Sequence, residues 1–510
     1  MCGIAAIIDP TASTESSNAT RAREGMLLDM LARIRHRGDP ERFGERWSGP
    51  GVAMGTNRLA IVDRPHARQP LTDSDEQIHV VFNGELYRYQ ELRRELAACG
   101  RTFRTDSDTE VLVHAYLEWG KEFIDRLDGM YAFVLHDLRR GSFLAGRDHI
   151  GIKPLYYAVR DGAYHFASEQ KCLLGVGAEI ETVEPGSYLW NGTVVQYFDL
   201  DQDRPVPESA VEAVARYREL FVEAVRKQVQ TDLPIAVMFS AGIDSAAVLH
   251  VARRYHPAVT AITVGVDGAA DIRTARRYCA EFGVNHIVAE LDHAALIDSL
   301  PQVIYGSEFF ETIDALDACF GNYAYQQARA HGFKVALCGE GSDEVLAGYD
   351  LFRSHEDPLA LMRYRVSNLH RTDLQRVDRS SMMNTVETRV PFMDRPLLEF
   401  SYALPMSMKL RDGTEKWVLR EAFRGDLPDY ITDRPKMRMP DGSGLKDTLL
   451  EYARQVVDLD EAILRELNIE TQEGAFFLRS YLDAGYPMPR ERFKRAGYDY
   501  SVNGYFEFVS

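Results

Sequence analysis

The spacing of apolar residues changes near residue 200, and this change limits the folds that the chain can adopt. Before it, short β-branched and aromatic runs alternate with turn dipeptides such as Asp161-Gly162 and Asn191-Gly192, and a helical stretch is expected at 108–119. After it, a helical stretch or a polar loop follows each of three short apolar runs, at 235–239, 258–264 and 334–338. The first pattern predicts an α+β domain of sheet layers packed against helices. The second predicts βαβ units and an α/β domain with a parallel sheet.

A polar segment separates the two patterns. The stretch Asp201–Glu208 contains two prolines and four charged residues and has little apolar content, which is typical of a linker. A chain of 510 residues is also too long for one hydrophobic core. We therefore expect one domain at 1–200, a linker at 201–209 and a second domain at 210–510.

Composition and charge exclude several classes of protein. The formal net charge of −18 argues against a nucleic-acid partner, and no apolar run approaches the ~20 residues of a membrane-spanning helix. The six cysteines include no CxxC pair, which favours reduced thiols over disulfides or zinc. The N-terminus also lacks the basic and long apolar regions of a secretory signal. We expect a cytoplasmic protein that binds neither nucleic acid nor membrane.

Cys2 is a candidate nucleophile. Met1 precedes a small residue, so its removal is expected to leave Cys2 with both a thiol and a free α-amine. An α-amine titrates near pH ~7.7 to 8.0 and a thiol near ~8.5, so the amine can accept the thiol proton at a cost of about 1 kcal/mol. The alternative is that Cys2 is only a small apolar residue at the start of the first strand.

Two further residues could serve chemistry at Cys2. Asn83 and Gly84 follow the apolar run 78–82, so an amide side chain and a backbone N–H are expected at a strand end, where they could stabilise an oxyanion. The alternative interpretation of this Asn-Gly pair is a plain hairpin turn.

A charged pair could recognise a free amino acid. Arg58 could hold a carboxylate through two hydrogen bonds, and Asp108 could pair with an α-ammonium group. The alternative for Asp108 is helix capping, which Asp106 or Ser107 could provide as well.

A second candidate site lies in the C-terminal half. The loop Ser240–Ser245 follows one apolar run and opens a helix, which predicts a phosphate cradle, although simple helix capping is the alternative. The segment Cys338–Glu344 follows another apolar run and carries two glycines and three carboxylates, which could supply a magnesium site and a general base or could form only a solvated acidic turn. Both segments are expected at the carboxyl edge of one parallel sheet, where such folds bind ligands.

With these residues in place, the chain resembles the glutamine-dependent asparagine synthetase family almost from end to end. The matching segments, in order, are Met1–Ile4, Arg58–Asp63, Phe82–Tyr87, Ser107–Glu110, Arg147–Pro154, Phe166–Glu169, Ser240–Ser245, Gly339–Glu344, Glu387–Asp394 and Arg434–Lys436. The resemblance implies an N-terminal glutaminase domain, an αββα sandwich of the N-terminal-nucleophile hydrolase type. It also implies a C-terminal ATP pyrophosphatase-type synthetase domain with an adenine-nucleotide α-hydrolase-like fold.

The resemblance also implies roles for residues of the first domain. Cys2 would attack the glutamine amide, with Asn83 and Gly84 as the oxyanion hole. The amino acid end of glutamine would bind at Arg58, Glu85 and Asp108.

Roles in the second domain follow in the same way. The resemblance implies that ATP and its pyrophosphate bind at Ser240, Gly242, Asp244, Ser245 and Gly339, and that main-chain groups near Met238 and Val264 bind adenine. Asp244 and Asp343 would hold Mg²⁺. Glu340 and Lys436 would manage proton transfer and charge while ammonia attacks the adenylate. The alternatives are that Glu340 serves only to position its loop and that Lys436 is an ordinary surface lysine. The expected substrates are glutamine, ATP and a small carboxylate acceptor, the products include AMP and pyrophosphate, and the family suggests a homodimer.

The match departs from the family in two places. Ala241 stands where the family loop has a glycine, and it would be strained if that glycine uses a positive φ. The family stretch Asp-Val-Thr-Thr-Ile-Arg-Ala-Ser corresponds to Glu311–Ala318, so a threonine and the arginine expected at the acceptor become Asp314 and Leu316, with Asp317 beside them. A cation is lost and carboxylates are gained. The hypothesis is an acceptor other than aspartate that carries an amine or a hydroxyl near these residues.

Two rival functions follow from the same motifs. A cyclase of the β-lactam synthetase type would use the same adenylating domain, but such proteins typically lack the glutaminase cysteine and carry Tyr in place of Glu340. A catalytically silent sensor of glutamine or nucleotide would have no chemical need for Cys2, Asn83, Asp244 and Asp343 together. Both considerations favour ammonia transfer.

Overall fold

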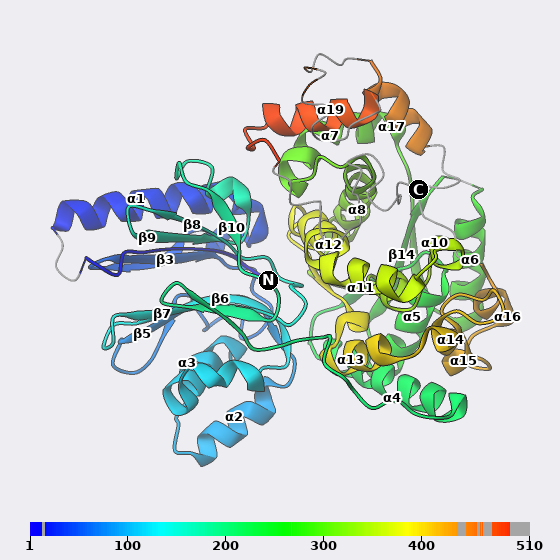
Figure 1. Cartoon of the computed structure of the whole chain (residues 1–510), viewed down its shortest axis with the longest axis horizontal. Coiled ribbons are helices and arrows are strands. Elements are labelled where there is room, and N and C mark those ends of the chain that lie inside the picture. The colour runs from blue at the N-terminus through cyan, green and yellow to red at the C-terminus, as the bar shows by residue number, and fades with distance from the viewer. Residues whose placement is uncertain are drawn as a thin grey trace.

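The computed structural model shows two lobes that meet along a broad contact (Figure 1). It describes residues 1–12, 16–266, 268–435, 445–455, 460, 462 and 472–489. Lys436 therefore lies outside the described residues. The chain leaves the first lobe after residue 196 and begins the first helix of the second lobe at residue 210, with no regular element in the described residues between them. The predicted linker at 201–209 falls in this stretch, and the domain limits themselves stay a prediction.

The N-terminal lobe consists of two stacked six-stranded sheets between helices (Figure 1). One sheet has the order β10-β8-β9-β1-β3-β2 and the other β12-β11-β7-β6-β5-β4. The strands are β1 (Gly3–Ile8), β2 (Glu45–Gly49), β3 (Val52–Asn57), β4 (Leu71–Thr72), β5 (Ile78–Leu86), β6 (Gly129–Asp137), β7 (Ser142–Arg147), β8 (Tyr156–Arg160), β9 (Ala163–Ala167), β10 (Ile180–Thr182), β11 (Ser187–Trp190) and β12 (Thr193–Gln196). Helix α1 (Ser17–Arg33) covers the first sheet, and α2 (Tyr89–Ala98) and α3 (Asp108–Trp119) cover the second. This αββα sandwich confirms the expected fold class.

Strand β1 shows how the sandwich buries both faces of a sheet. Ile4 and Ala6 pack between the two sheets against Val81 of β5, whereas Ala5 and Ile7 face the residues of α1. Because successive side chains of a strand point to opposite faces, a strand with a helix on one side and a sheet on the other must be apolar throughout. The uniformly apolar sequence that follows Cys2 has this cause.

Two hairpin turns of the N-terminal lobe lie where the sequence predicts them, whereas one strand ends later than expected. Asp161-Gly162 and Asn191-Gly192 connect β8 to β9 and β11 to β12 with positive φ at all four residues, as expected for hairpin turns. The expectation that the strand before Asn83 ends at residue 82 is wrong. Strand β5 continues to Leu86, with Asn83 opposite Ala132 and Gly84 opposite Tyr131, so the hairpin interpretation of this Asn-Gly pair is excluded.

The C-terminal lobe contains a five-stranded sheet in which every pair is parallel, in the order β15-β14-β13-β16-β17. The strands are β13 (Ile235–Met238), β14 (Val259–Gly265), β15 (Asn285–Glu290), β16 (Val335–Leu337) and β17 (Glu387–Arg389). Chain order runs outward from β13 in one direction and from β16 in the other, so the switch point lies between these two strands. Ligands of open parallel sheets bind at the carboxyl ends of such strands.

Helices cover both faces of this sheet. Ile235 and Val237 of β13 pack in a core shared with α4 and α5, while Ala236 packs against α8 on the opposite face. The helices are α4 (Ala210–Gln228), α5 (Ile243–Tyr255), α6 (Ala270–Phe282), α7 (His293–Ser307), α8 (Thr312–Ala330), α9 (Ser342–Val345), α10 (Leu351–Ser354), α11 (Pro358–Asn368), α12 (Asp373–Met382), α13 (Arg395–Ala403), α14 (Met406–Lys409), α15 (Trp417–Phe423), α16 (Asp429–Thr432), α17 (Leu445–Ala453) and α19 (Gln472–Asp483). Within the described residues, no helix is both long and apolar enough to cross a membrane.

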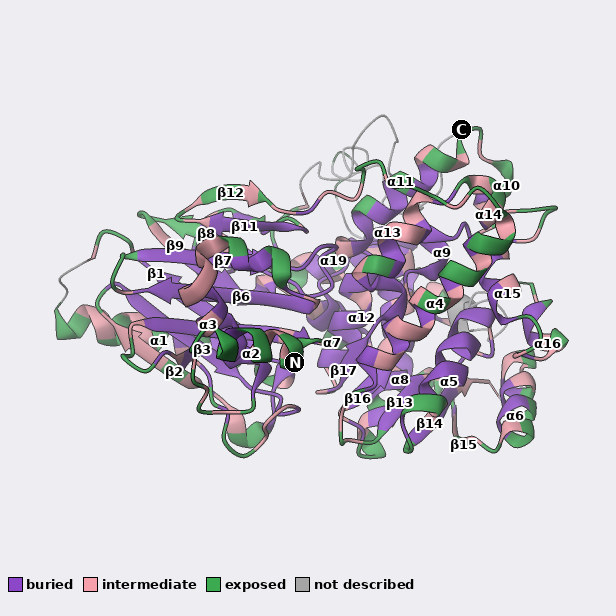
Figure 2. Ribbon diagram, turned by 90° about the horizontal axis from the view of Figure 1, so that it is seen from below, coloured by how far each residue is buried: buried purple, intermediate pink, exposed green. Residues whose placement is uncertain are grey.

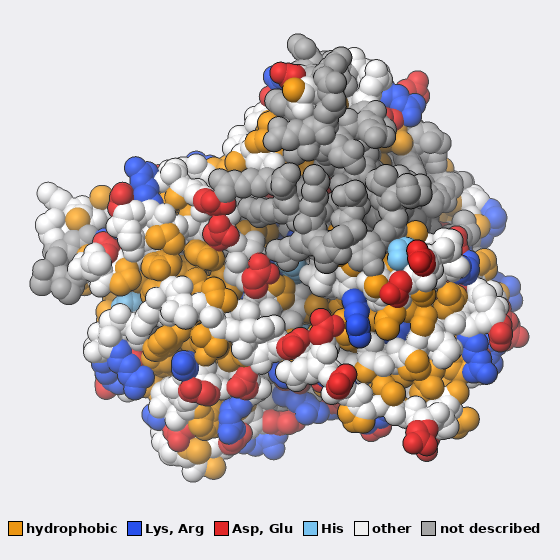
Figure 3. Space-filling view, in the orientation of Figure 1, with side chains coloured by type: hydrophobic (Ala, Val, Ile, Leu, Met, Phe, Trp, Pro, Cys, Tyr) orange, Lys and Arg blue, Asp and Glu red, His pale blue; other side chains and the backbone are white. Residues whose placement is uncertain are grey.

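Buried charges join the lobes. Arg37 of the N-terminal lobe donates to both carboxylate oxygens of Asp378 on α12, at 2.8 and 3.0 Å, and to Glu169 Oε1 at 2.6 Å. All three side chains are at most 1% exposed, and Figure 2 shows the elements on both sides of the contact as largely buried. On the outer face in Figure 3, Lys and Arg side chains are interspersed with Asp and Glu.

Candidate active sites

Cys2 lies buried at the start of β1, with 5% of its surface exposed. Its backbone N–H donates to Asn83 Oδ1 at 3.0 Å, and Gln69 Nε2 lies 3.9 Å from its Sγ. Burial raises the pKa of the Cys2 thiol, and the positive charges of the N-terminal amine and Arg58 lower it. Burial has the larger effect, so the pKa of the thiol in the empty site is raised.

Asn83 has a free donor beside Cys2. Its side chain is fully buried, its Oδ1 holds the Cys2 backbone, and its Nδ2 has no hydrogen-bond partner in the described part of the chain. A buried amide nitrogen without an acceptor costs free energy. Such unpaired donors persist in folded proteins chiefly where a ligand or reaction intermediate supplies the acceptor. The neighbouring Gly84 has no room for a side chain, since a Cβ there would lie 2.2 Å from the carbonyl oxygen of Met130.

The predicted glutamine-binding residues converge on the same place. Asp108 Oδ2 accepts from the backbone N–H of Leu86 at 3.1 Å, and Glu85 Oε2 lies 3.5 Å from Arg389 Nη2 of the other lobe. Burial raises the pKa of Asp108 to about 6, and burial together with Glu387 raises the pKa of Glu85 well above its usual value. The cap of α3 is Ser107, whose Oγ accepts from Thr109 N–H at 3.2 Å, so capping does not require Asp108.

Arg58 is held in place by backbone oxygens. Its Nη2 donates to the carbonyl oxygens of Val62 and Asp63 at 2.8 and 3.3 Å, and only 4% of the residue is exposed. These bonds orient the guanidinium without neutralising it, since carbonyl oxygens carry no net charge. The charge therefore stays available to a carboxylate.

The N-terminus itself reaches the other lobe. The ammonium group of Met1 donates to Glu387 Oε2 on β17 at 2.9 Å, and both side chains are fully buried. Arg389, two residues further along β17, donates to Glu387 Oε1 at 2.7 Å and pairs with Glu85. The glutaminase residues and the second lobe therefore share one ion network.

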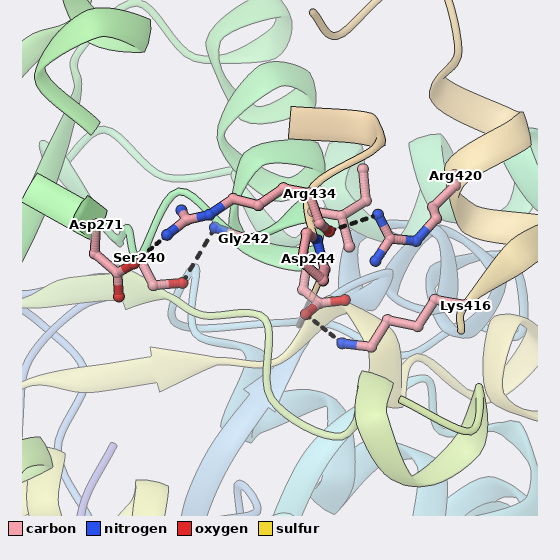
Figure 4. Close-up of a pocket in the computed structure, with 9 residues that line it drawn as sticks. Ser240, Gly242, Asp244, Asp271, Lys416, Arg420 and Arg434 are labelled. Atoms are coloured by element: carbon pink, nitrogen blue, oxygen red, sulfur yellow. Dashed lines mark hydrogen bonds and ion pairs between the residues drawn. The ribbon is translucent and has the colours of Figure 1, made fainter. Parts of the chain in front are cut away.

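The loop after β13 has the geometry of an anion site (Figure 4). Ser240 Oγ and Ser245 Oγ lie 3.2 Å apart, and the Gly242 N–H at the start of α5 donates to Ser240 Oγ at 3.4 Å. Arg434 Nη1 donates to the carbonyl oxygen of Ala241 at 3.1 Å, and its Nη2 pairs with Asp271 (Figure 4). Hydroxyls, a helix N-terminus and a guanidinium together suit phosphate.

Ala241 has the positive φ that was expected to strain an alanine at this position of the loop. Its φ is +57°, in the left-handed region where a Cβ is disfavoured, and the residue is fully buried. The chain therefore accepts local strain at a position that suits glycine.

The loops after β13 and β16 touch. A Cβ on Gly339 would lie 2.8 Å from Asp244 Cβ, so only glycine permits this approach. Lys416 Nζ lies between the two predicted metal ligands, 2.5 Å from Asp244 Oδ2 and 2.6 Å from Asp343 Oδ1. Sequence reasoning missed Lys416, which follows Glu415 at the start of α15 and belongs to none of the motifs.

The residues present here fit a magnesium ion. Asp244 Oδ1 is buried and has no hydrogen-bond partner among the residues that the structure describes. Mg²⁺ in nucleotide sites is usually held by one or two carboxylates, substrate phosphates and water. Asp244 and Asp343 supply two carboxylates beside a phosphate loop.

A cavity of about 210 Å³ opens at this switch point. Among the predicted nucleotide-site residues, its walls include Met238, Ser240, Asp244, Ser245, Gly339, Glu340 and Asp343. Gly242 lines a smaller adjoining pocket together with Lys416 and Arg434 (Figure 4), and Val264 on β14 lines neither. The structure thus gathers the predicted nucleotide residues except Val264, and it does not describe Lys436.

One of the three predicted acceptor residues lines the cavity, and a second lies buried behind it. Asp317 of α8 lines it, and Asp314 lies one turn earlier on the same helix, buried beside Arg376 of α12. The expectation that Leu316 faces the acceptor is wrong. Leu316 points to the opposite side of α8 and packs in a hydrophobic cluster with Leu300 and Phe477, because residues 314 and 316 are about 200° apart around a helix.

The two lobes match two known families in the same order. Residues 1–203 match the glutamine amidotransferase domain family, and residues 216–360 and 353–499 match the asparagine synthase family. Asparagine synthetase [glutamine-hydrolyzing] 2 of Arabidopsis thaliana is 33% identical over 533 residues, which covers 96% of this chain and 89% of the relative. The chain belongs to the glutamine-hydrolysing asparagine synthetase family.

Other members of the family show the same extent of similarity. A probable asparagine synthetase [glutamine-hydrolyzing] of Dictyostelium discoideum is 31% identical over 532 residues, covering 96% of this chain and 94% of its own. Among solved structures, a glutamine phosphoribosylpyrophosphate amidotransferase from B. subtilis is 18% identical, with a TM-score of 0.32 and coverage of 56% of this chain and 65% of its own.

Proposed function

We propose that the chain hydrolyses glutamine at Cys2 and uses the ammonia to amidate a carboxylate that ATP has activated as an adenylate. The observation that carries this proposal is the position of β16 and β17 between the two sites. Arg389 of β17 pairs with Glu85 of the glutaminase site, and the residues after β16 line the nucleotide cavity. Two reaction centres that exchange an intermediate are expected to share such a scaffold.

Glutamine hydrolysis follows from the residues around Cys2. After removal of Met1, the Cys2 α-amine accepts the thiol proton, and the thiolate attacks the side-chain carbonyl carbon of glutamine. Asn83 Nδ2 and the Gly84 N–H stabilise the oxyanion of the tetrahedral intermediate. The α-ammonium gives the thiol proton to the leaving nitrogen, so that collapse of the intermediate releases ammonia. Water then hydrolyses the thioester to glutamate and frees the Cys2 thiol. Arg58 and Asp108 bind the carboxylate and ammonium group of the substrate.

Activation of the acceptor takes place in the second lobe. A carboxylate is a poor acyl donor because its leaving group would be oxide. Attack of its oxygen on the α-phosphorus of ATP forms an acyl adenylate and expels pyrophosphate, which Ser240, Gly242 and Lys416 are placed to bind. Asp244 and Asp343 would hold Mg²⁺, which neutralises phosphate charge when it is bound.

Ammonia then attacks the adenylate carbonyl, and AMP leaves. Glu340 lines the cavity and is placed to take the proton that the attacking nitrogen loses. Ammonia must reach the adenylate away from water, where most of it would become ammonium, and buried ion pairs such as Arg37 with Asp378 exclude water from part of the contact between the lobes. The family resemblance also suggests a homodimer, which gel filtration with light scattering would test.

Product analysis tests this proposal. Purified full-length chain with ATP, MgCl₂, glutamine and a carboxylate should yield glutamate, AMP, pyrophosphate and an amide. Formation of ADP and phosphate would contradict it. In Cys2→Ala, the glutamine-driven reaction should disappear while the reaction driven by ammonium chloride persists, with Cys99→Ala, which changes an exposed thiol, as the matched control. If the ammonium-driven reaction is also lost, the division of labour between the lobes is wrong.

A further inference from the structure

The acceptor end of the synthetase cavity is dominated by carboxylates. Asp317, Glu340 and Asp373 line it, and Arg376 is the single Lys or Arg side chain among the described residues of its wall. A second carboxylate on the acceptor would therefore lie among like charges.

The guanidinium of Arg376 is already surrounded. Its Nη1 lies 3.2 Å from Asp314 Oδ1 and 3.6 Å from Asp317 Oδ2. Its Nη2 lies 2.6 Å from Asp373 Oδ1 and also donates to Glu340 Oε1. Four carboxyl groups of the protein thus share one cation, so a substrate carboxylate would have to compete with them for Arg376.

Asp314 retains an unused acceptor inside this cluster. The residue is 0% exposed, its Oδ1 contacts Arg376, and its Oδ2 has no hydrogen-bond partner in the described ranges of the chain. Burial raises the pKa of Asp314 well above its usual value despite Arg376, and Glu311 and Asp373 raise it further. A buried carboxyl in an excess of negative charge is stabilised by a ligand that brings hydrogen-bond donors and positive charge.

We propose that the acceptor is an amino-carboxylate with a single carboxyl group, whose ammonium group binds beside Asp314 and Asp317 at the end of the cavity formed by α8 and α12. This inference rests on the proposed function of the cavity as an adenylating site. An ammonium group supplies three donors to the carboxylates that line the cavity, Asp317 among them, and its charge also offsets that of the buried Asp314 behind them, whereas a hydroxyl supplies one donor and no charge. The carboxyl group of the same molecule points toward the phosphate loop at Ser240 and becomes the amide.

A matched acceptor series tests the charge requirement. β-Alanine is aspartate without its α-carboxylate, succinate is aspartate without its amine, and 3-hydroxypropanoate replaces the amine of β-alanine with a hydroxyl. The same comparison is repeated with longer carbon chains: 4-aminobutanoate and 5-aminopentanoate are each compared with the diacid and the hydroxy acid of equal chain length. Pyrophosphate release is measured with the full-length chain, ATP, MgCl₂ and saturating ammonium chloride, so that glutamine hydrolysis does not limit the rate.

The expected result is a higher kcat/KM for the amino-carboxylate than for its diacid and hydroxy counterparts in at least one length class, by about tenfold or more. Aspartate should be poorer than the best amino-carboxylate. A preference for aspartate, for another diacid or for a hydroxy acid would overturn this inference and leave the proposed function standing. No pyrophosphate from any carboxylate, with glutaminase activity intact, would overturn the proposed function and this inference together.

Variants separate recognition from folding. Asp317→Asn should raise KM for the amino-carboxylate by about tenfold with little change in kcat or in KM for ATP, because it removes charge and keeps the shape of the side chain. Asp317→Glu should restore the preference for the amine, and Asp298→Asn, which changes an exposed aspartate on α7, should change nothing. Equal losses for charged and uncharged acceptors in Asp317→Asn would show a structural role and contradict the assignment. Asp314→Asn gives a second test at the buried position, with the thermal midpoint as a check on folding.

Discussion

The side chain of Asn83 holds the backbone N–H of Cys2 through its Oδ1 at 3.0 Å, while the amide nitrogen of the same side chain has no hydrogen-bond partner in the portion of the chain that the structure describes. One residue therefore positions the nucleophile and keeps a donor ready beside it. Preorganisation of this kind is effective because the donor needs no reorientation when the oxyanion forms.

Replacement of Asn83 should affect one site and not the other. We expect Asn83→Ala to lower kcat for glutamine hydrolysis by about 10²- to 10³-fold, the usual loss when an oxyanion donor is removed. Synthesis driven by ammonium chloride in the same variant is the internal control and should keep its rate. Glutamate release, measured alongside pyrophosphate release, reports both reactions. An unchanged glutaminase rate would assign the oxyanion to other donors.

Glutamine binding should weaken in acid because of Asp108. Burial raises the pKa of this carboxyl to about 6, so the empty site loses its charge as the pH falls through that value, and a neutral carboxyl cannot pair with the ammonium group of glutamine. The affinity for glutamine should therefore be constant above about pH 7 and fall by up to tenfold per unit below about pH 6. Calorimetry on Cys2→Ala, which cannot hydrolyse the ligand, measures Kd without the chemical step.

The matched variant is Asp108→Asn in the Cys2→Ala chain. It should bind glutamine about tenfold more weakly at pH 8 and lose the change in affinity near pH 6. If the double variant keeps the full pH dependence, another carboxyl, such as Glu85, carries it.

The nucleotide loops were predictable from sequence for a physical reason. Strands β13 and β16 are short apolar runs because helices cover both faces of the parallel sheet, and this pattern is visible without a structure. Once both runs are assigned to one sheet, Asp244 and Asp343 must follow their carboxyl ends at the same edge. The same reasoning placed the end of the strand at residue 82, where the apolar run stops, whereas pairing with β6 carries β5 through Asn83 to Leu86.

Residues supplied by distant helices could not be found in this way. Lys416 and Asp244 are 172 positions apart, and Arg376 reaches Asp314 from another helix 62 positions away. Nothing in the local sequence of either basic residue marks it as different from a surface cation. Helical spacing could, however, have separated Leu316 from Asp314 and Asp317, since the two aspartates share one face of α8.

Lys416 should be needed for adenylation but not for glutamine hydrolysis. Its Nζ lies within 2.6 Å of both Asp244 and Asp343, so it neutralises the two carboxylates beside the phosphate loop. We expect Lys416→Met, which preserves length and removes charge, to lower pyrophosphate release by about 10²-fold or more. The apparent Kd for Mg²⁺ or Mn²⁺, measured by calorimetry without nucleotide, should decrease because the lysine no longer competes for the carboxylates. Unchanged pyrophosphate release would show that the lysine serves folding alone.

Ala241 and Ala246 offer a paired test of backbone strain in the phosphate loop. Both are fully buried, but Ala241 has a φ of +57° whereas Ala246 lies inside helix α5. Replacement of either by glycine removes one buried methyl group and increases the freedom of the unfolded chain, which together cost roughly 1 to 2 kcal/mol. Only Ala241→Gly also removes the strain of a left-handed backbone conformation, which stabilises the folded state by about 1 to 2 kcal/mol. The free energy of unfolding should therefore hardly change in Ala241→Gly and should fall in Ala246→Gly, as measured by denaturant unfolding of the C-terminal lobe followed by intrinsic fluorescence. Equal losses in the two variants would mean that the loop holds Ala241 without strain, and the family's glycine would then have to be explained by contact with phosphate instead.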